Sequence, residues 1–217
     1  MLPGRGAVPW VSAAALIVAN AVPVFGVLYG GWRVFDILLL YSLENVVIGF
    51  YNVLKMRRAP CDEEELRRTS KGITSKAGLI GFFCLHYGTF AALHLFFVVV
   101  LFGVAFAGER EGLVRQTWWP LPLAFGGMWI SHGVSYVRNF VAGREYERTT
   151  ANRLFASPYA RIVVMHVAIL GGAFAVVFTG QGIAPLVILV VGKTIVDLAS
   201  HLAERRRFAR AATGMVR

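Results

Sequence analysis

Residues 77–106 of this 217-residue chain are AGLIGFFCLHYGTFAALHLFFVVVLFGVAF, a run that contains no Asp, Glu, Lys or Arg. A membrane-spanning helix needs about 20 consecutive apolar residues, so this run is long enough to cross a bilayer at a tilt. The whole chain is 57% hydrophobic and only 16% charged, whereas soluble domains keep about a quarter of their residues charged. Together these features predict a polytopic membrane protein.

Hydropathy along the rest of the chain predicts five further membrane spans within one domain that covers residues 1–217. We expect the six spans at 9–28, 33–54, 77–106, 118–142, 159–179 and 182–203. The first apolar run is longer than the apolar core of a signal peptide, so we expect it to be a retained span. The predicted fold is therefore an all-α bundle of six transmembrane helices.

Basic residues are distributed unequally between the two sets of loops. The formal net charge is +10, and most Lys and Arg lie in the loops after the second and fourth spans or in the carboxy-terminal tail. The opposite loops hold only Arg33, Arg110 and Arg115. Since basic loops stay in the cytoplasm, we expect both termini to be cytoplasmic. This asymmetry accounts for the charge without a nucleic-acid partner and makes membrane lipid the expected partner.

Three local patterns make predictions about individual segments. Residues 62–68 are DEEELRR, an order of charges that suits the dipole of a short surface helix, although a solvated loop is the simpler interpretation and both stay open. Ser157 and Pro158 predict the N-cap and the first residue of the fifth span. The pairs Gly126-Gly127 and Gly171-Gly172 predict close helix packing.

Ionisable residues interrupt the apolar spans. They are Glu44, His86, His94, His132, His166, Lys193, Asp197 and His201. An unpartnered charge in hydrocarbon costs about 3 kcal/mol or more, so several at similar depth indicate a site. The helical rise places most of them roughly 6 to 18 Å from the basic side of the membrane. His94 lies deeper, at roughly 27 Å, so we expect it to stand apart.

Spacing within the helices supports one polar site in the cytoplasmic half. Lys193, Asp197 and His201 follow one another at i, i+4 and i+8, so they form one stripe in which Lys193 and Asp197 can pair. Four polar residues of the second helix crowd broadly on one side. They are Tyr41, Glu44, Asn45 and Asn52. We therefore expect the second and last helices to contribute to the same cavity.

Imidazoles and carboxylates from several helices are the ligands that zinc or non-haem iron requires. The predicted metal ligands are His86, His166, Asp197 and His201. Glu44 and Lys193 are the predicted catalytic residues of a site in which the metal would activate water or oxygen. The chain has no HExxH motif and no dense histidine box, so the sequence leaves open whether the protein is an enzyme.

Three other functions would use the same group of residues. A proton-coupled transporter of small solutes would relay protons or bind a small anion through Glu44, His86, Lys193 and Asp197. A b-type haem protein would use histidines from two helices as axial ligands of haem. A structural membrane scaffold would use the cluster only to fix how its helices pack.

Three motifs resemble a known family. They are YSLENVVIGFYN at 41–52, FFCLHYG at 82–88 and KTIVDL at 193–198. The sequence resembles, from the second helix to the last, a bacterial family of multi-pass membrane proteins known only as a domain of unknown function. The resemblance implies residence in the bacterial inner (cell) membrane, and it implies no particular reaction.

Overall fold

The computed structural model describes residues 25, 28–29, 34–70, 72–102, 120–179 and 186–196. Its labelled α-helices are α2 (Val34–Arg58), α3 (Glu63–Thr69), α4 (Lys76–Phe97), α7 (Pro120–Ser135), α8 (Ala151–Ala156) and α9 (Tyr159–Thr179). Two π-helical segments, η1 (Val98–Phe102) and η3 (Tyr136–Ala142), continue α4 and α7, and a 3₁₀ turn, η4, covers Glu145–Arg148. A further apolar helix is Leu186–Val196. These residues include no strand, so the prediction of an all-α fold is confirmed for the described part of the chain.

Within the described part of the chain, three helical segments are long and apolar enough to cross a membrane. They are Val34–Arg58, Lys76–Leu101 and Ala151–Phe174. They correspond to the predicted second, third and fifth spans. Pro120–Ala142 is helical where the fourth span is predicted, and Leu186–Val196 is a shorter helix within the predicted sixth. The predicted first span lies almost entirely outside the described residues.

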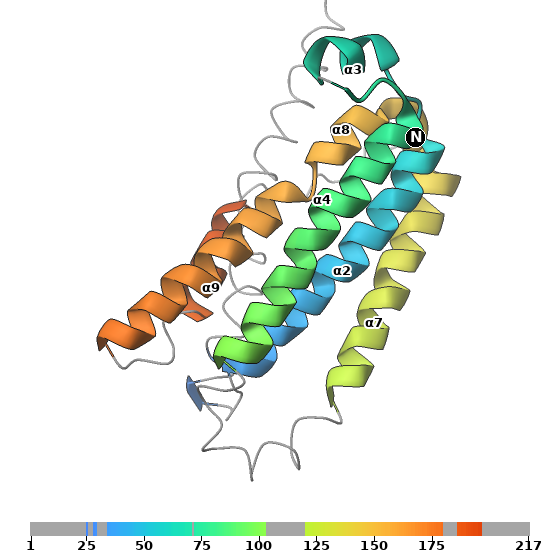
Figure 1. Ribbon diagram of the computed structural model, residues 1–217. Helices are drawn as coiled ribbons and strands as arrows, with labels where there is room; N and C mark the ends of the chain where they lie inside the picture. Colours follow the sequence, from blue (N-terminus) through green and yellow to red (C-terminus); the bar gives the residue numbers. More distant parts are fainter. Residues whose placement is uncertain are drawn as a thin grey trace, which may run out of the picture.

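The helices form a bundle in which α2 lies between α4 and α7, and α9 packs beside α4 (Figure 1). α2 and α4 are antiparallel, because Met56 shares a buried cluster with Leu79 and Leu38 shares another with Val98. α7 runs in the direction of α2. Two successive contacts show this: Tyr51 donates to the Trp129 carbonyl, and Lys55 lies over the Phe140 ring. Spans that follow one another along the chain therefore alternate in direction, whereas the packed pair α2 and α7 is parallel.

Two glycines allow the helices of the bundle to approach closely. A Cβ atom on Gly49 would lie 2.6 Å from the Tyr87 ring, and the Tyr87 hydroxyl donates to the Asn45 carbonyl at 3.0 Å. A Cβ atom on Gly133 would lie 2.7 Å from the Tyr51 hydroxyl. An aromatic side chain of one helix thus packs against the backbone of its neighbour at both places.

Three of the four glycines in the pairs that the sequence selects show no such close approach among the described residues. Among the described residues, nothing lies within 4 Å of a Cβ atom built on Gly126 or Gly127, so the predicted close packing is not found there. On Gly171 it would make only an ordinary contact, 3.6 Å from Ile188 Cδ1. Adjacent glycines occupy two different sides of a helix, so their presence alone does not identify the side that meets a neighbour.

A short cap of polar structure covers one end of the bundle. Residues 63–69 form a helix rather than an open loop, with Asp62 as its N-cap accepting from the Glu65 amide at 2.8 Å. α9 begins at Tyr159, as predicted. Ser157 is not its N-cap, however, because its hydroxyl donates back to the Leu154 carbonyl at 2.9 Å. Ser157 instead ends α8 in a helical conformation.

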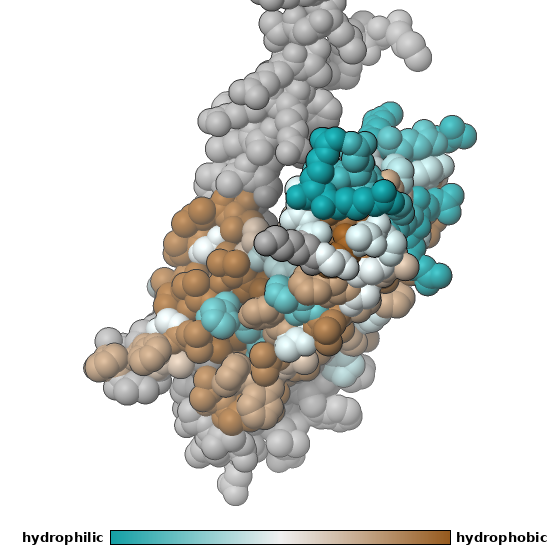
Figure 2. Space-filling view, turned by 45° about the horizontal axis from the view of Figure 1, so that its top comes forward, coloured by the Kyte–Doolittle hydropathy of each residue, from teal (hydrophilic) through white to brown (hydrophobic). Residues whose placement is uncertain are grey.

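Hydrophilic residues gather around α3, whereas hydrophobic residues cover much of the surface away from it (Figure 2). Several large apolar side chains on the outer helix faces are mostly exposed, including Leu85 (71%), Ile130 (69%) and Phe178 (82%). Water-soluble proteins rarely expose contiguous apolar surface on this scale. The outer surface therefore suits contact with lipid.

Candidate functional site

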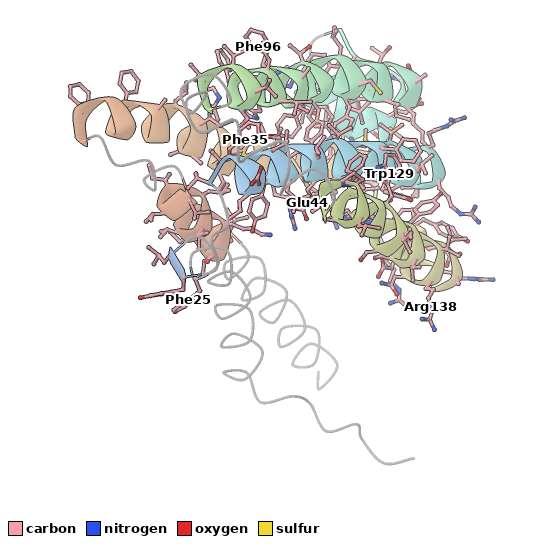
Figure 3. The ribbon with its side chains drawn as sticks, turned by 90° about the horizontal axis from the view of Figure 1, so that it is seen from below. Phe25, Phe35, Glu44, Phe96, Trp129 and Arg138 are labelled. Carbon is pink, nitrogen blue, oxygen red and sulfur yellow. The ribbon has the colours of Figure 1, made fainter. Side chains whose placement is uncertain are left out.

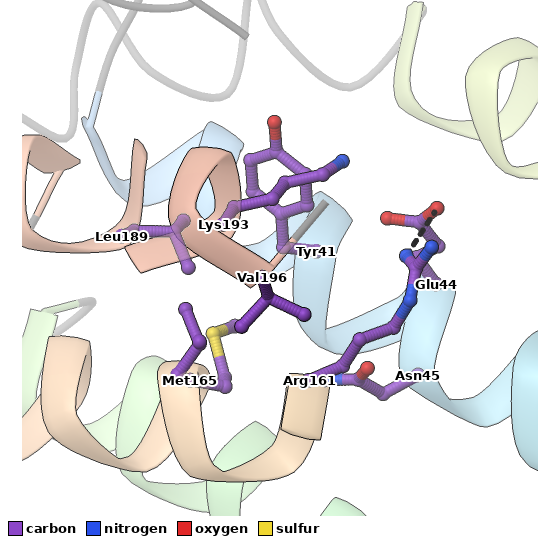
Figure 4. A pocket seen from close by; sticks show the side chains of 9 residues that line it. Tyr41, Glu44, Asn45, Arg161, Met165, Leu189, Lys193 and Val196 are labelled. Carbon is purple, nitrogen blue, oxygen red and sulfur yellow. Dashed lines mark ion pairs between the residues drawn. The ribbon is translucent and has the colours of Figure 1, made fainter. Parts of the chain in front are cut away.

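A small polar pocket lies where α2, α9 and the helix Leu186–Val196 meet (Figure 4). Its lining residues are Tyr41, Glu44, Asn45, Arg161, Val164, Met165, Leu189, Lys193 and Val196. The cavity has a volume of about 30 Å³. Between the described lining residues, this is enough for a water molecule or a similarly small ion.

Helix geometry explains why these side chains converge. Tyr41, Glu44 and Asn45 are spaced three and four residues apart, so they share one face of α2. Gly192 allows the last described helix to approach α9, because a Cβ atom there would lie 2.9 Å from Val164 Cγ1. This approach brings Lys193, the next residue, into the pocket beside the α2 face.

Three charged side chains are among the described residues that line the pocket. Glu44 Oε1 lies 3.6 Å from Arg161 Nη1, and the Glu44 side chain is 17% exposed. Lys193 Nζ lies 4.6 Å from the centroid of the Tyr41 ring, in a cation–π contact. The described lining thus carries two cationic groups and one carboxylate, a net positive charge when all three are ionised. Such a lining attracts an anion.

Arg161 has the donors to bind an anion while it remains paired with Glu44. A guanidinium group carries five N–H donors, and the ion pair with Glu44 engages one of its nitrogens. The Lys193 ammonium has three donors. Its contact with the face of the Tyr41 ring is a cation–π contact and not a hydrogen bond to an oxygen or nitrogen acceptor. Asn45 adds a side-chain amide to the same wall. The pocket therefore offers several donors to one small negative ligand.

His86 belongs to a separate site, at the contact between α4 and α9. Its Nδ1 lies 2.9 Å from the Tyr159 hydroxyl. The Phe90 ring packs against His86 at 5.1 Å and against His166 at 6.5 Å. Along this contact, aromatic rings therefore alternate with imidazoles.

His94 does not stand apart, so that prediction is wrong. Its Nε2 lies 3.1 Å from Nδ1 of His166 on α9. The prediction measured depth along each helix separately. α4 and α9 run in the same direction, but α9 begins beside His86, partway along α4, so His94 and His166 lie at the same level. His94 is 2% exposed, and its Nδ1, like the buried Ser42 Oγ, has no hydrogen-bond partner in the described structure.

The predicted site residues are thus divided between two places. Glu44 and Lys193 line the pocket, whereas His86 and His166 lie on the α4–α9 contact with different partners. Asp197 and His201 lie outside the described residues. Within the residues that the structure describes, no three His, Cys, Asp or Glu side chains come together as a possible metal site. The four-residue metal set stays a prediction, because half of it falls on undescribed residues.

Sequence reasoning missed Arg161 and Tyr159 as members of these sites. Arg161 was expected to be one of the cytoplasmic basic residues that set the orientation of the chain. A signal was nevertheless present: if the fifth span begins at residue 159, Arg161 already lies inside the helix, where its charge needs a partner. Tyr159 had no such signal, because a tyrosine at a helix end is ordinary in a membrane protein.

Comparison with known proteins gives a family and no activity. No curated protein and no solved structure matches the chain. One family model, Family of unknown function (DUF6498), matches residues 4–214 and so includes all three motifs quoted above. Since the match covers almost the whole sequence, the chain belongs to this family of unknown function.

Proposed function

We propose that the protein is an integral membrane protein that binds a small inorganic or carboxylate anion in the Arg161–Lys193 pocket and carries it across the membrane. The observation that carries this proposal is the convergence of Arg161 and Lys193 on one cavity whose described lining includes a single carboxylate, Glu44. Glu44 compensates one of these two cations, and the second positive charge at the edge of an apolar bundle favours a further counter-charge. A bound anion would supply it.

The proposal includes the six-span topology with both termini in the cytoplasm of a bacterial cell. The alternating direction of the helices supports it, as does the grouping of Lys55, Arg58 and Lys76 at one end of the bundle. Basic residues at one end are typical of the cytoplasmic side. In this orientation the pocket lies partway into the membrane from the cytoplasm, as a substrate site of a transporter does.

Anion binding by the purified full-length protein tests the proposal. We expect chloride or acetate to bind the wild type in calorimetric titration, with an affinity that falls about tenfold or more in Lys193→Met and in Arg161→Met, since each variant loses a charge-assisted contact. Lys55→Met is the matched control, because Lys55 also lies over an aromatic ring, at 5.5 Å from the Phe140 centroid, but outside the pocket. Absence of binding of both anions to the wild type would overturn the proposal.

The histidine contacts favour proton coupling as a second part of the function. His94 and His166 are joined by a hydrogen bond between ring nitrogens, which is an arrangement that can pass a proton. We expect anion flux into proteoliposomes to be driven by an imposed pH gradient in the wild type and to lose that drive in His166→Phe. Unchanged dependence of flux on the pH gradient in His166→Phe would exclude the histidine pair from the coupling.

A further inference from the structure

A second concave surface lies between α2 and α7, farther along α2 than the Arg161–Lys193 pocket. It is a groove of about 500 Å³ lined by Tyr51, Trp129, Ile130, Gly133, Val134, Val137 and Arg138. Its walls are almost entirely apolar. Arg138 is the charged residue of the described lining, and it comes last among the lining residues along the chain. From Ile130 to Val137 the helix rises about 10 Å, so the groove runs along the helix axis for roughly a third of a bilayer's hydrocarbon thickness.

The floor of the groove is built from aromatic rings that contact the backbone of the neighbouring helix. The Tyr51 hydroxyl donates to the Trp129 carbonyl at 3.0 Å, and the two rings are 5.7 Å apart. Gly133 leaves room for the Tyr51 hydroxyl, since a Cβ atom there would lie 2.7 Å from it. The rims of the groove stay open, with Ile130, Val134 and Val137 all exposed.

The charged end of the groove coincides with a change in helix type. At Tyr136 the α-helix gives way to the π-helical segment η3, whose wide turn closes with a bond of 3.0 Å from the Gly143 amide to the Arg138 carbonyl. π-Helical turns within α-helices are frequent at functional sites. Figure 3 shows Trp129 on the part of α7 that meets α2 and Arg138 farther along, pointing away from the bundle.

Arg138 supplies the charge in the described lining of this end of the groove, and two more cations lie against aromatic rings of the residues that follow it. Arg138 is exposed, Lys55 Nζ lies over the nearby Phe140 ring, and the Arg58 guanidinium lies 4.8 Å from the centroid of the Tyr146 ring. The described groove therefore has an apolar length and a cationic end. This combination is complementary to a lipid in which an acyl chain is joined to a negatively charged head group.

We propose that this groove is a binding site for an anionic phospholipid, with one acyl chain along Trp129 and Val134 and the phosphate at Arg138. The inference rests on membrane residence, and it is independent of the anion pocket. Each cation near a lipid surface strengthens binding of an anionic lipid about fivefold. The site therefore discriminates by head-group charge at Arg138 and holds the chain by burial of apolar surface.

Native mass spectrometry of the detergent-purified full chain tests the proposal, with dioleoyl phosphatidylglycerol and dioleoyl phosphatidylcholine as the two probes. We expect the wild type to retain phosphatidylglycerol about fivefold better than phosphatidylcholine. Arg138→Gln should abolish this preference while leaving phosphatidylcholine binding unchanged. Val134→Trp should fill the groove and reduce binding of both lipids. Val163→Trp is the matched control, because Val163 is 60% exposed on α9, away from the groove.

Ile130→Trp is a second groove-filling variant in case Val134→Trp lowers the stability of the protein. Lipid binding equal to the wild type in Arg138→Gln and in both groove-filling variants would overturn the proposal. So would a wild-type dimer that these tryptophan variants dissociate, since the groove would then hold a second copy of the chain. Arg161→Met separates the two proposals: it should weaken chloride or acetate binding and leave the phospholipid preference intact.

Discussion

At the scale of single residues, the contact of Gly49 with Tyr87 holds the two central helices together. The missing Cβ atom lets the Tyr87 ring lie against α2, and the Tyr87 hydroxyl then reaches the Asn45 carbonyl. Tyr87 is 3% exposed and belongs to the larger buried cluster. A side chain at position 49 would push α2 away from α4. This would disturb both sites, because α2 lines the polar pocket and α4 carries the histidines that contact α9.

Gly49→Ala should therefore destabilise the protein by about 1 to 3 kcal/mol, because the added methyl group would lie 2.6 Å from the Tyr87 ring and force the helices apart. Gly88→Ala is the matched control on the partner helix, since nothing lies within 4 Å of its added atom. The control should be neutral or slightly stabilising, as Ala favours helix over Gly. Unfolding of the detergent-purified variants by denaturant measures both effects. Equal stability of the two variants would show that this contact is not tight.

Cys61 provides a pH-dependent prediction outside the membrane-spanning helices. Burial raises the pKa of the Cys61 thiol above its ordinary value, and the nearby Glu63 carboxylate adds to the effect. Because only the thiolate reacts, alkylation of Cys61 by iodoacetamide in a Cys84→Ala background should be slower at pH 8 than alkylation of free cysteine. The rate should still be rising at pH values where free cysteine has reached its plateau. If the alkylation rate of Cys61 reached its plateau at the same pH as that of free cysteine, or at a lower pH, the raised pKa would be contradicted.

At the scale of elements, much of the fold follows from hydropathy. The predicted 33–54 became Val34–Arg58, and the predicted 159–179 matches α9 to the residue. Hydropathy identifies apolar length, which is what these helices share. It gives no information on where two helices meet, and the search for adjacent glycines did not find the close approaches at Gly49 and Gly133.

The polar cap depends on a contact that joins the end of α2 to the start of α4. Lys76 Nζ donates to the Arg57 and Ala59 carbonyls, each at 2.6 Å. These carbonyls lie at the carboxy-terminal end of α2, where a cation also interacts favourably with the helix dipole. Lys76→Met should therefore destabilise the protein by about 1 kcal/mol. Arg68→Met removes an exposed ion pair with Glu64 and should cost less than about 0.5 kcal/mol. Thermal unfolding of both variants tests this, and an equal loss in both would argue against a capping role for Lys76.

The candidate site was predictable only in part, for a physical reason. Glu44 and Lys193 were identifiable because a charge inside an apolar helix requires compensation, and both line the pocket. Their partners depend on the offset and rotation of neighbouring helices, which a single sequence does not give. Arg161 pairs with Glu44, and His166 pairs with His94, across helix contacts that periodicity alone cannot place.

At the scale of the whole molecule, polar groups lie at two levels inside an apolar bundle. The Arg161–Lys193 pocket is bounded by α2, α9 and the helix Leu186–Val196, and the histidine pair lies between α4 and α9. α9 takes part in both, since Arg161 and His166 are on the same helix. A shift of α9 that opens the pocket would therefore also change the contact between His94 and His166, which would give the proposed proton coupling a mechanical basis.

The affinity of the Glu44→Gln variant for chloride and acetate tests the anion pocket most directly. Glu44 competes with a bound anion for Arg161 and repels it, so removal of its charge should tighten anion binding severalfold, by about the energy of one charge interaction near a protein surface. Lys193→Met should change the affinity in the opposite direction, and Lys55→Met should leave it unchanged. A Glu44→Gln variant that binds these anions more weakly than the wild type would contradict the account, because the Glu44 carboxylate would then contribute to anion binding rather than oppose it by charge repulsion.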